Sequence, residues 1–430
     1  MIAILLCLAS LVAGIFYPGV LIAGCLFTYQ AASLSGMDGL TIAYSGAAAV
    51  ISIGHFLKNK PKISLNFLDA SFLIFILVVM STTLYAVDNA SAVAMDIKLA
   101  MSAFTMYVVG RLIVVSTPSR TLAPQIITGA LIFGAAFSLV IYQHASAEYW
   151  SRLKVGAGSA VGLAQPLPYV LVCAVLAIVS TIGSRKYFLA LGAFVAGAVV
   201  LYISILSGTR GIFIAAAAGV AVVGFVGWRQ ARWGRLIGLG VVALVVLVAV
   251  APRVEATKRL TYGIDRLIGN FGSSGVVVDS SAQQRINKQH AALDLIDQKT
   301  RLGTGIGGYD YLTHEEYPHN LFLEVATETG LLGLFFLLIY LWALFRRQAL
   351  AAMIDPPLGL TMLALTTTAF VHQQLSFALY MAKPLFLLTG LTAGAMGAFA
   401  VRRSRQTPPA PPRRRRVASP KPVDATHPEA

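Results

Sequence analysis

The stretch LLGLFFLLIYLWALF, residues 331–345, contains no charged side chain and decides the class of fold. Similar apolar stretches recur along the chain, in which 57% of the 430 residues are hydrophobic and 12% are charged. A soluble core does not need so much apolar surface, so the composition predicts a polytopic membrane protein. Backbone groups in lipid must be satisfied within each segment, and the strands of a barrel would alternate apolar and polar residues. We therefore expect an all-α fold.

A membrane-spanning helix needs about 20 apolar residues. The other candidate spans are residues 39–57, 69–87, 98–115, 122–143, 161–182, 187–206, 211–228, 235–251, 358–378 and 384–401. Residues 2–35, interrupted at Pro18, are long for one helix and short for two. We interpret them as one kinked helix, which predicts about 12 transmembrane helices in all; a true hairpin would give 13.

Basic residues in the short connections predict the orientation, because cytoplasmic loops carry an excess of Lys and Arg. One set of connections carries Lys58, Lys60, Lys62, Arg111, Arg120, Arg185, Lys186, Arg229, Arg232, Arg235, Arg346 and Arg347. The opposite set carries Lys98, Arg152, Lys154, Arg210 and Lys383. The richer set is expected to be cytoplasmic, with both termini on that side. Arg111 lies within an apolar run near its cytoplasmic end, so we expect its side chain to snorkel to the membrane surface.

This orientation divides the chain into four parts. Residues 1–251 and 331–401 are the N-terminal and C-terminal transmembrane helices, and residues 252–330 form one long periplasmic loop with amphipathic helices. Residues 402–430 form a Pro-rich basic tail, which we expect to be disordered and cytoplasmic. Directly after a span, its arginines fit contact with anionic membrane lipids, and we expect no nucleic acid partner.

Two arginines stand out on the expected periplasmic side. Arg210, in SGTRG at 207–211, is held between two apolar runs, and a cation at a membrane boundary is a functional candidate by default. Arg285 lies in the first turn of a predicted amphipathic helix over residues 281–296, whose apolar stripe contains Ile286, Leu293 and Ile296. That stripe is expected to lie on the membrane surface or on the bundle.

Two further motifs have readings that the sequence excludes. GTGIGG at 303–308 matches a dinucleotide fingerprint but lacks the strand–turn–helix context, so we interpret it as flexible backbone leading into a site. His314 and His319 are separated by Pro318 and do not have the spacing of a zinc-protease helix. No metal and no cofactor is therefore expected. The three cysteines lie in apolar runs and predict no disulfide framework.

Pro318 suits the first position of a helix, which would place His319 in the first turn. The helix dipole there disfavours imidazolium and would keep a basic histidine neutral. Glu324 and Glu328 follow, four residues apart on one helix face. They either orient partners or only cap a polar groove.

Taken together, Arg210 after SGT, the helix with Arg285 and ALDLI, the GxGxxxY stretch and PHNLFLEVATETGLLG at 318–333 resemble the O-antigen ligase and polymerase superfamily of membrane glycosyltransferases, a group with a GT-C-like organisation. The resemblance implies an undecaprenyl-diphosphate-linked glycan donor, a lipid A-core acceptor and a periplasmic site in the bacterial inner membrane. It also implies that Arg210 and Arg285 bind the diphosphate and that His319 is the catalytic base. Further candidate supporting residues are Arg152, Lys258, Tyr311, Asn320 and Glu324.

We therefore expect an O-antigen ligase of lipopolysaccharide biosynthesis, inverting and metal-independent. An O-antigen polymerase or a protein O-oligosaccharyltransferase would use the same donor, and the motifs do not separate these siblings. A membrane transporter is a more distant alternative that would show internal repeats and broken helices. A structural scaffold is disfavoured by three chemically suited residues on one face.

Overall fold

The fold is given by a computed structural model, which describes residues 2–37, 39–144, 163, 165–183, 186–207, 209–227, 280–299 and 301–406. Within these ranges every regular element is a helix, which confirms the all-α class. The predicted span 235–251, the end of the basic tail from 407 onward, Arg152 and Lys258 lie outside the described residues.

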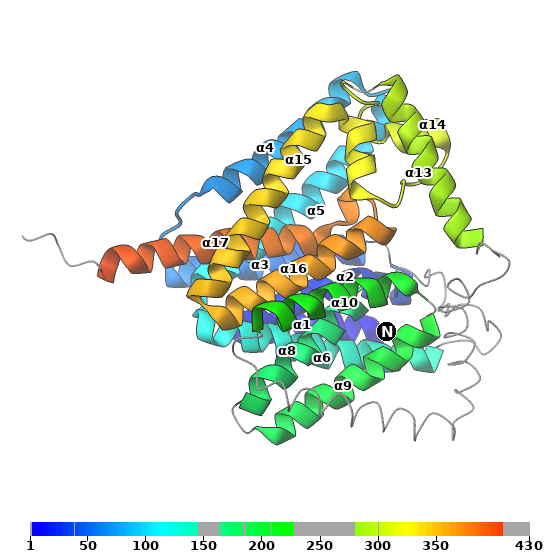
Figure 1. The fold of residues 1–430 in the computed structure, drawn as a ribbon. Coiled ribbons are helices and arrows are strands. Elements are labelled where there is room, and N and C mark those ends of the chain that lie inside the picture. The colour runs from blue at the N-terminus through cyan, green and yellow to red at the C-terminus, as the bar shows by residue number, and fades with distance from the viewer. Residues whose placement is uncertain are drawn as a thin grey trace, which may run out of the picture.

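The first half of the chain contributes a set of long apolar helices (Figure 1). These are α1 (Ile2–Phe16), α2 (Pro18–Ser35), α3 (Leu40–Asn59), α4 (Phe67–Ser81), the short η1 (Thr82–Tyr85), α5 (Asn89–Ser116), α6 (Ser119–His144), α8 (Leu167–Gly183), α9 (Tyr187–Ser207) and α10 (Arg210–Gly227). The second half contributes α13 (Ser280–Gln298), α14 (Gly308–Thr313), α15 (Leu321–Ile354), α16 (Pro356–Ser376), η3 (Leu379–Met381) and α17 (Lys383–Gln406).

Six of the described helices are long and apolar enough to cross a membrane. They are Leu40–Asn59, Phe67–Tyr85, Asn89–Ser116, Ser119–Gln143, Tyr187–Ser207 and Leu321–Ile354. Helices α1, α8 and α10 are apolar but shorter. The protein is thus a helical membrane protein, and the total of about 12 spans stays a prediction.

Residues 2–35 form two helices, so the expectation of one kinked helix is wrong. Tyr17 leaves the helical region (φ −126°, ψ 82°), and Pro18 begins α2, where its missing N–H costs nothing. The two helices then fold back on each other: Gly14 packs against Leu21, and Ser10 lies against Gly24. A side chain at Gly14 or Gly24 would collide with its neighbour, so small residues permit this hairpin. The predicted total of about 12 spans counted residues 2–35 as one helix, whereas they form two.

The bundle has two ends of different character. At one end, the Asn59 side chain at the end of α3 donates a hydrogen bond to the Ser116 carbonyl at the end of α5 (2.8 Å). At the other end, the start of α5 packs against residues 305–307, because Gly307 lies against Ser91 and Met95. Helix α5 has 28 residues and so separates the two ends by about 42 Å. The lysine-rich connection after α3 and the segment before α15 consequently lie far apart.

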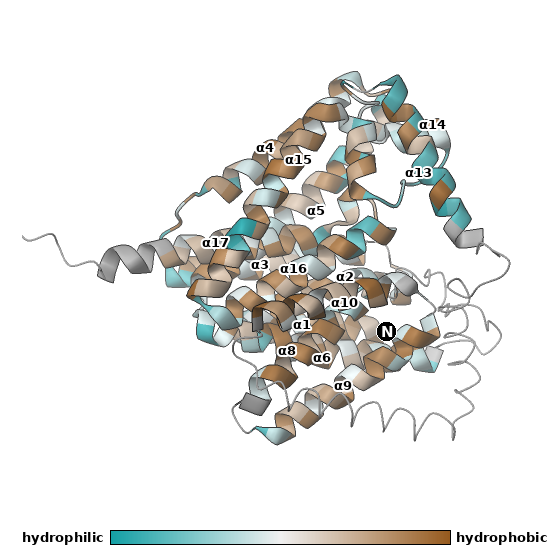
Figure 2. Cartoon of the chain, viewed as in Figure 1, coloured by the Kyte–Doolittle hydropathy of each residue, from teal (hydrophilic) through white to brown (hydrophobic). Residues whose placement is uncertain are grey.

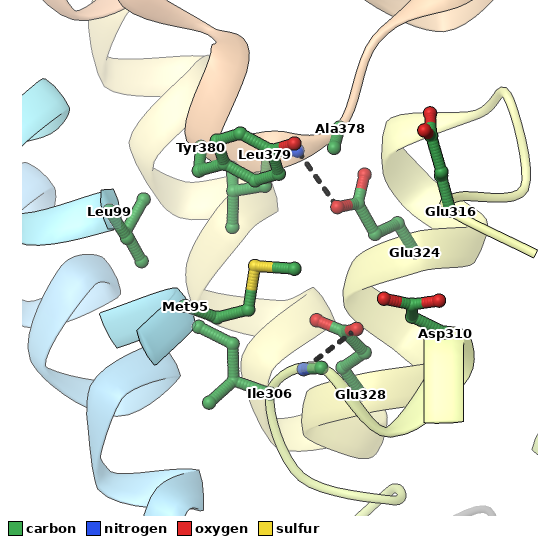
Figure 3. Close-up of a pocket in the computed structure, with 11 residues that line it drawn as sticks. Met95, Leu99, Ile306, Asp310, Glu316, Glu324, Glu328, Ala378, Leu379 and Tyr380 are labelled. Carbon is green, nitrogen blue, oxygen red and sulfur yellow. Dashed lines mark hydrogen bonds between the residues drawn. The ribbon is translucent and has the colours of Figure 1, made fainter. Parts of the chain in front are cut away.

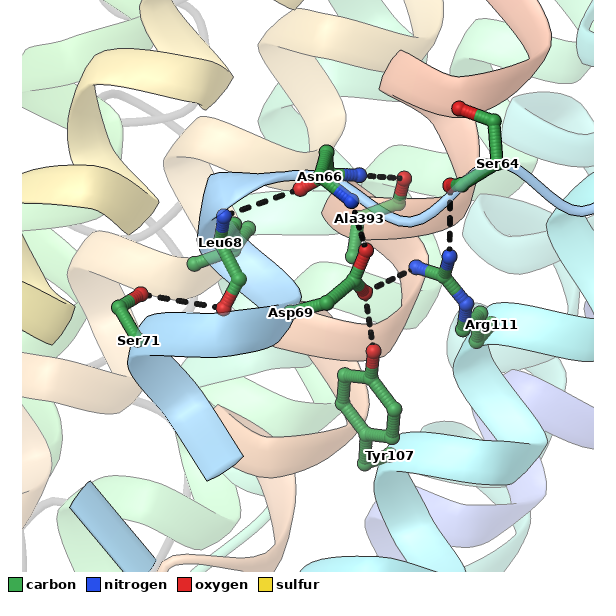
Figure 4. A network of polar contacts seen from close by, with 8 residues as sticks. All are labelled: Ser64, Asn66, Leu68, Asp69, Ser71, Tyr107, Arg111 and Ala393. Carbon is green, nitrogen blue, oxygen red and sulfur yellow. Dashed lines mark hydrogen bonds and ion pairs between the residues drawn. The ribbon is translucent and has the colours of Figure 1, made fainter. Parts of the chain in front are cut away.

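Arg111 does not snorkel to the surface as expected, but is buried inside the bundle at 5% exposure (Figure 4). Its guanidinium pairs with the Asp69 carboxylate and donates a hydrogen bond to the Ser64 carbonyl (2.9 Å). The Tyr107 hydroxyl donates to the same carboxylate. The expectation failed because Asp69, in the first turn of the neighbouring helix α4, offers a partner for the charge that sequence spacing did not reveal.

This buried ion pair predicts a stability effect. Arg111→Leu should leave the Asp69 carboxylate buried without its partner, which typically costs about 3–5 kcal/mol. The double variant Arg111→Leu/Asp69→Leu should recover most of that loss, because both charges are then gone. The measurement is the thermal unfolding midpoint in detergent, with exposed Arg346→Leu as the control. Equal midpoints for Arg111→Leu and Arg346→Leu would contradict the role of this pair.

Hydrophilic residues concentrate on α13, which lies beside α14 at the end of the bundle away from the α17 terminus (Figure 2). Of its predicted apolar stripe, Ile286 and Leu293 are exposed (42% and 50%), whereas Ala292 is fully buried. The Thr327 hydroxyl of α15 approaches the Ala292 carbonyl (3.4 Å), so α13 packs on α15 through small residues. The larger side chains of Ile286 and Leu293 are exposed on its outer side.

Candidate functional site

Helix α15 begins at Leu321, and His319 precedes it instead of lying in its first turn. The Asn320 side chain is the N-cap and accepts hydrogen bonds from the N–H groups of Phe322 (2.9 Å) and Leu323 (3.1 Å). Pro318 is therefore not the first helical residue, and the expected position of His319 is wrong. A capping asparagine competes well for the free N–H groups, which moves the helix start past the histidine.

His319 has a left-handed backbone (φ 56°), a conformation in which histidine is found more often than most residues. The imidazole forms a hydrogen bond with the backbone of Leu375 at the end of α16. Its Nδ1 is buried and has no hydrogen-bond partner among the described residues. A neutral imidazole has one N–H and one lone pair, so a tautomer with its proton on Nε2 would leave the lone pair on Nδ1.

Burial, and to a lesser extent the positive charges of Arg285 and Lys288, lower the pKa of His319 from 6.5 to about 4. His319 is therefore neutral at physiological pH, as a general base must be. The sequence predicted a neutral histidine for a different reason, the dipole of a helix beginning at Pro318. That helix begins at Leu321, two residues after His319. Burial and two cations from α13 keep His319 neutral instead.

Two contacts at Lys288 hold helix α13 beside His319. The Lys288 ammonium pairs with the Glu315 carboxylate (2.6 Å), and the Tyr309 hydroxyl donates to the Lys288 carbonyl (2.9 Å). Arg285 lies three residues earlier and therefore on the same face of the helix. The electrostatic influence of Arg285 on both His319 and Tyr317 agrees with this placement.

Arg210 begins α10, and the structure describes its backbone. The next residue, Gly211, approaches Leu375 and Ser376, because a Cβ built on it would lie 3.6 Å from the Ser376 hydroxyl. Leu375 is also the residue that bonds His319. The structure thus brings the backbone of Arg210 to the end of α16 where His319 is anchored, with Arg285 close by.

The carboxylates of Glu324 and Glu328 accept hydrogen bonds from backbone segments, and both of their predicted roles stay open. Glu324 Oε1 accepts from the Leu379 N–H of η3 (2.8 Å), and Glu328 Oε1 accepts from the Gly307 N–H (3.0 Å) (Figure 3). Together with Asp310 and Glu316 they line a small cavity of about 20 Å³, enough for about one water molecule. Glu324 Oε2 is buried and lacks a hydrogen-bond partner within the described ranges.

The glycine-rich segment 303–308 is held in place, so its expected flexibility is wrong. The N–H groups of Thr304 and Gly305 donate to the Thr327 and Glu328 carbonyls (2.9 and 2.8 Å), and the Ile306 N–H donates to the Thr82 hydroxyl (2.9 Å). Gly303 has a positive φ of 76°, and a Cβ there would lie 2.5 Å from the Glu328 carbonyl oxygen. Glycine is required because two backbones meet at this point.

Gly330 marks the end of the site segment of α15. It leaves the helical conformation (φ 65°, ψ −165°) within the long helix, and a Cβ there would lie 2.3 Å from the Arg301 carbonyl oxygen. The kink falls at the predicted boundary between residues 252–330 and 331–401. Residues 321–329 thus form a short helix that carries the two glutamates. The apolar helix that contains residues 331–345 follows it.

A larger cavity, of about 1060 Å³, adjoins this site. It is lined by α2, α3, the middle of α5 and residues 377–384, and it shares Glu316 and Tyr380 with the small cavity. Tyr317 lines the large cavity, and its ring packs edge-on against His319 with 4.5 Å between the ring centroids. Tyr317 therefore stands between the histidine and the cavity. A volume of this size accommodates a drug-sized or larger ligand.

The remaining candidate residues take peripheral positions. Tyr311, on α14, is 51% exposed and is not among the residues that line either cavity. His314 ends α14 and is exposed. Among the described residues, no group of three or more His, Cys, Asp or Glu side chains is arranged to hold a metal ion. Metal independence of the reaction stays a prediction.

Sequence reasoning missed Tyr317, Lys288 and the end of α16. Tyr317 and Lys288 lie two and three residues from predicted site residues, so helical and loop spacing offered a signal for them. Leu375 acts through its backbone, about 55 residues away in the sequence from His319, and has no side-chain signature.

Residues 195–338 match the family model described as O-antigen ligase. Residues 195–338 are therefore similar to the O-antigen ligase family, which confirms the resemblance drawn from the motifs. No curated protein matches the chain. The matched residues include Arg210, Arg285 and His319, whereas α16 and most of the large cavity lie outside them.

Proposed function

We propose that this membrane protein with an O-antigen ligase domain transfers a glycan from undecaprenyl diphosphate to a sugar hydroxyl of lipid A-core oligosaccharide. The observation that carries the proposal is the environment of His319. It is a neutral histidine whose buried Nδ1 has no hydrogen-bond partner among the described residues, beside Arg285 and next to a large cavity. A neutral base next to a cation is what the transfer of a glycan from a diphosphate requires.

The reaction is a direct displacement at the anomeric carbon of the donor. The acceptor hydroxyl oxygen attacks that carbon, its proton passes to His319 Nδ1, and the bond from the anomeric carbon to the diphosphate oxygen breaks. One displacement inverts the configuration at the carbon. The proton acceptor must come within hydrogen-bond reach of the hydroxyl. Because Nδ1 is enclosed with Tyr317 packed against the ring, we expect Tyr317 to move when the acceptor enters.

The leaving diphosphate gains negative charge as the bond breaks. Guanidinium groups remain charged at every relevant pH and match phosphate oxygens with two parallel hydrogen bonds. Arg285 and Arg210 would supply this stabilisation, with Lys288 adding charge on the same face of α13 as Arg285. No metal ion is required in this mechanism, because the arginines perform the electrostatic work.

The site is proposed to face the periplasm. The support is the separation between the lysine-rich connection after α3 and the site end of α5, since basic loops are cytoplasmic. We predict that a cysteine introduced at His314, which is exposed, reacts with a membrane-impermeant thiol reagent in spheroplasts. A cysteine at Lys60 should be protected until the membrane is opened. The reverse pattern would overturn both the orientation and the proposed location of the site.

A reconstituted transfer assay tests the function itself. The purified protein would receive lipid-linked glycan and one of three acceptors: lipid A-core, a second lipid-linked glycan or an acceptor protein. Transfer to lipid A-core alone is expected, and it should continue unchanged in excess EDTA. Transfer only to the second lipid-linked glycan would identify a polymerase, and transfer only to protein would identify a protein O-oligosaccharyltransferase. Loss in EDTA with recovery in Mg²⁺ would contradict metal independence.

A further inference from the structure

The large cavity contains two lysines that the proposed reaction does not use. Lys98 lies in the first half of α5, and Lys383 is the first residue of α17; both line the cavity of about 1060 Å³. The Lys98 ammonium lies 5.5 Å from the centroid of the Tyr380 ring, which also lines the cavity. The two cations thus come from separate helices to one concave surface.

Neither lysine is neutralised by a neighbouring acid. Within the described part of the chain, no carboxylate lies at ion-pair distance from Lys98 or Lys383. Glu316 lines the same cavity and is exposed at its border with the small cavity. Two lysines against one carboxylate leave the cavity wall positively charged.

The position of Lys383 is unfavourable in the absence of a ligand. It is half-buried, and it occupies the N-terminus of a helix, where the helix dipole repels a cation. A half-buried ammonium loses hydration and must regain it from hydrogen bonds or an opposite charge. A bound anion would supply that charge.

The rest of the wall fits a sugar. Residues with hydroxyl groups from three helices line the cavity, including Thr28 on α2, Ser45 on α3 and Thr105 on α5. Apolar residues such as Phe377 and Met101 lie between them. A mixture of hydroxyls and apolar surface suits the polar edges and apolar faces of carbohydrate rings. The lysines add a preference for a negatively charged group.

We propose that this cavity binds an acceptor glycan that carries a phosphate group, with Lys98 and Lys383 pairing with the phosphate. This inference rests on the proposed function. The acceptor is favoured over the donor because the cavity lining includes both lysines and Tyr380 but not Arg285, the arginine proposed to hold the donor diphosphate. The cavity is therefore a second anion-binding region, separated from the proposed diphosphate site by Tyr317. Both lysines also lie outside the residues that match the O-antigen ligase model.

Equilibrium binding to the full-length protein in nanodiscs of zwitterionic lipid tests this proposal. The probes are a water-soluble phosphorylated oligosaccharide, the same oligosaccharide after phosphatase treatment, and farnesyl diphosphate. The variant Lys98→Gln/Lys383→Gln should bind the phosphorylated probe at least about tenfold more weakly than the wild type, because two charge-assisted contacts are lost. Its affinity for the dephosphorylated probe and for farnesyl diphosphate should not change.

Two variants control for charge and for folding. Lys58→Gln/Lys62→Gln removes two exposed lysines near the opposite end of the bundle and should bind like the wild type. Lys98→Arg/Lys383→Arg keeps both charges and should retain most of the affinity for the phosphorylated probe.

Three results would overturn the proposal. Equal wild-type affinity for the phosphorylated and dephosphorylated probes would remove the phosphate preference, and unchanged binding in the Gln variant would remove the lysines. A loss confined to farnesyl diphosphate would assign the cavity to the donor instead of the acceptor. Failure of glycan transfer in a protein that shows the expected binding would overturn the proposed function alone.

Discussion

Replacement of His319 by asparagine is expected to lower the turnover number by about 10²–10⁴-fold, the usual contribution of general-base catalysis. Asparagine tolerates the left-handed backbone of this position (φ 56°), so the variant should fold and insert like the wild type. It cannot accept the proton from the acceptor hydroxyl. The measurement is the initial rate of glycan transfer at saturating donor and acceptor.

The chain supplies a matched control five residues earlier. His314 has the same φ of 56° but is exposed and caps the short helix α14. His314→Asn should therefore leave the turnover number nearly unchanged. If His319→Asn keeps the wild-type rate while His314→Asn abolishes it, the base is misassigned and His319 is a structural residue.

The pH dependence of glycan transfer is an independent test of His319 as the base. Burial, Arg285 and Lys288 hold the pKa of His319 at about 4 instead of 6.5, so the neutral form persists to lower pH. The kcat/KM value, which reports the free enzyme, should fall as the pH decreases through about 4. In Arg285→Gln, one of the causes that lower this pKa is absent, and the acid limb of the residual activity should move toward higher pH. An acid limb already near 6.5 in the wild type would contradict the environment described for His319.

Replacement of Arg285 by glutamine is expected to lower the turnover number by about 10²–10³-fold, the size of effect seen when one donor to developing negative charge is removed. Arg285→Lys keeps the charge but loses the planar pair of N–H donors, so we expect it to recover only part of the rate and to remain at least about tenfold slower than the wild type. The measurement is the rate of transfer at saturating acceptor across a range of donor concentrations.

Arg301 provides the control for this prediction. It is an exposed arginine in the same region of the chain, and only its backbone is in the close contact with Gly330. Arg301→Lys should transfer glycan at the wild-type rate. Full activity in Arg285→Lys would show that charge alone suffices and would remove the role of this side chain as a diphosphate clamp.

The sequence by itself determined the class of fold and the region of the candidate site. Apolar stretches such as 331–345 have one stable arrangement in a membrane, the helix, so composition and length predicted most helices to within a few residues. The motif at 318–333 predicted the family and singled out His319, because this local pattern of residues is contiguous in the chain. Apolar stretches and contiguous motifs depend only on residues that are neighbours along the chain. The sequence alone therefore specifies them.

Tertiary structure alone decided the features that depend on contacts between distant segments. Arg111 turned inward because Asp69 lies on the adjacent helix, and residues 2–35 became a hairpin because Gly14 and Gly24 allow close packing. His319 is neutral through burial and the cations of α13, and its Nδ1 is buried without a hydrogen-bond partner among the described residues. The lysines of the large cavity come from α5 and α17. Charge pairing and burial are set by distance in space, which residue spacing along the chain does not specify.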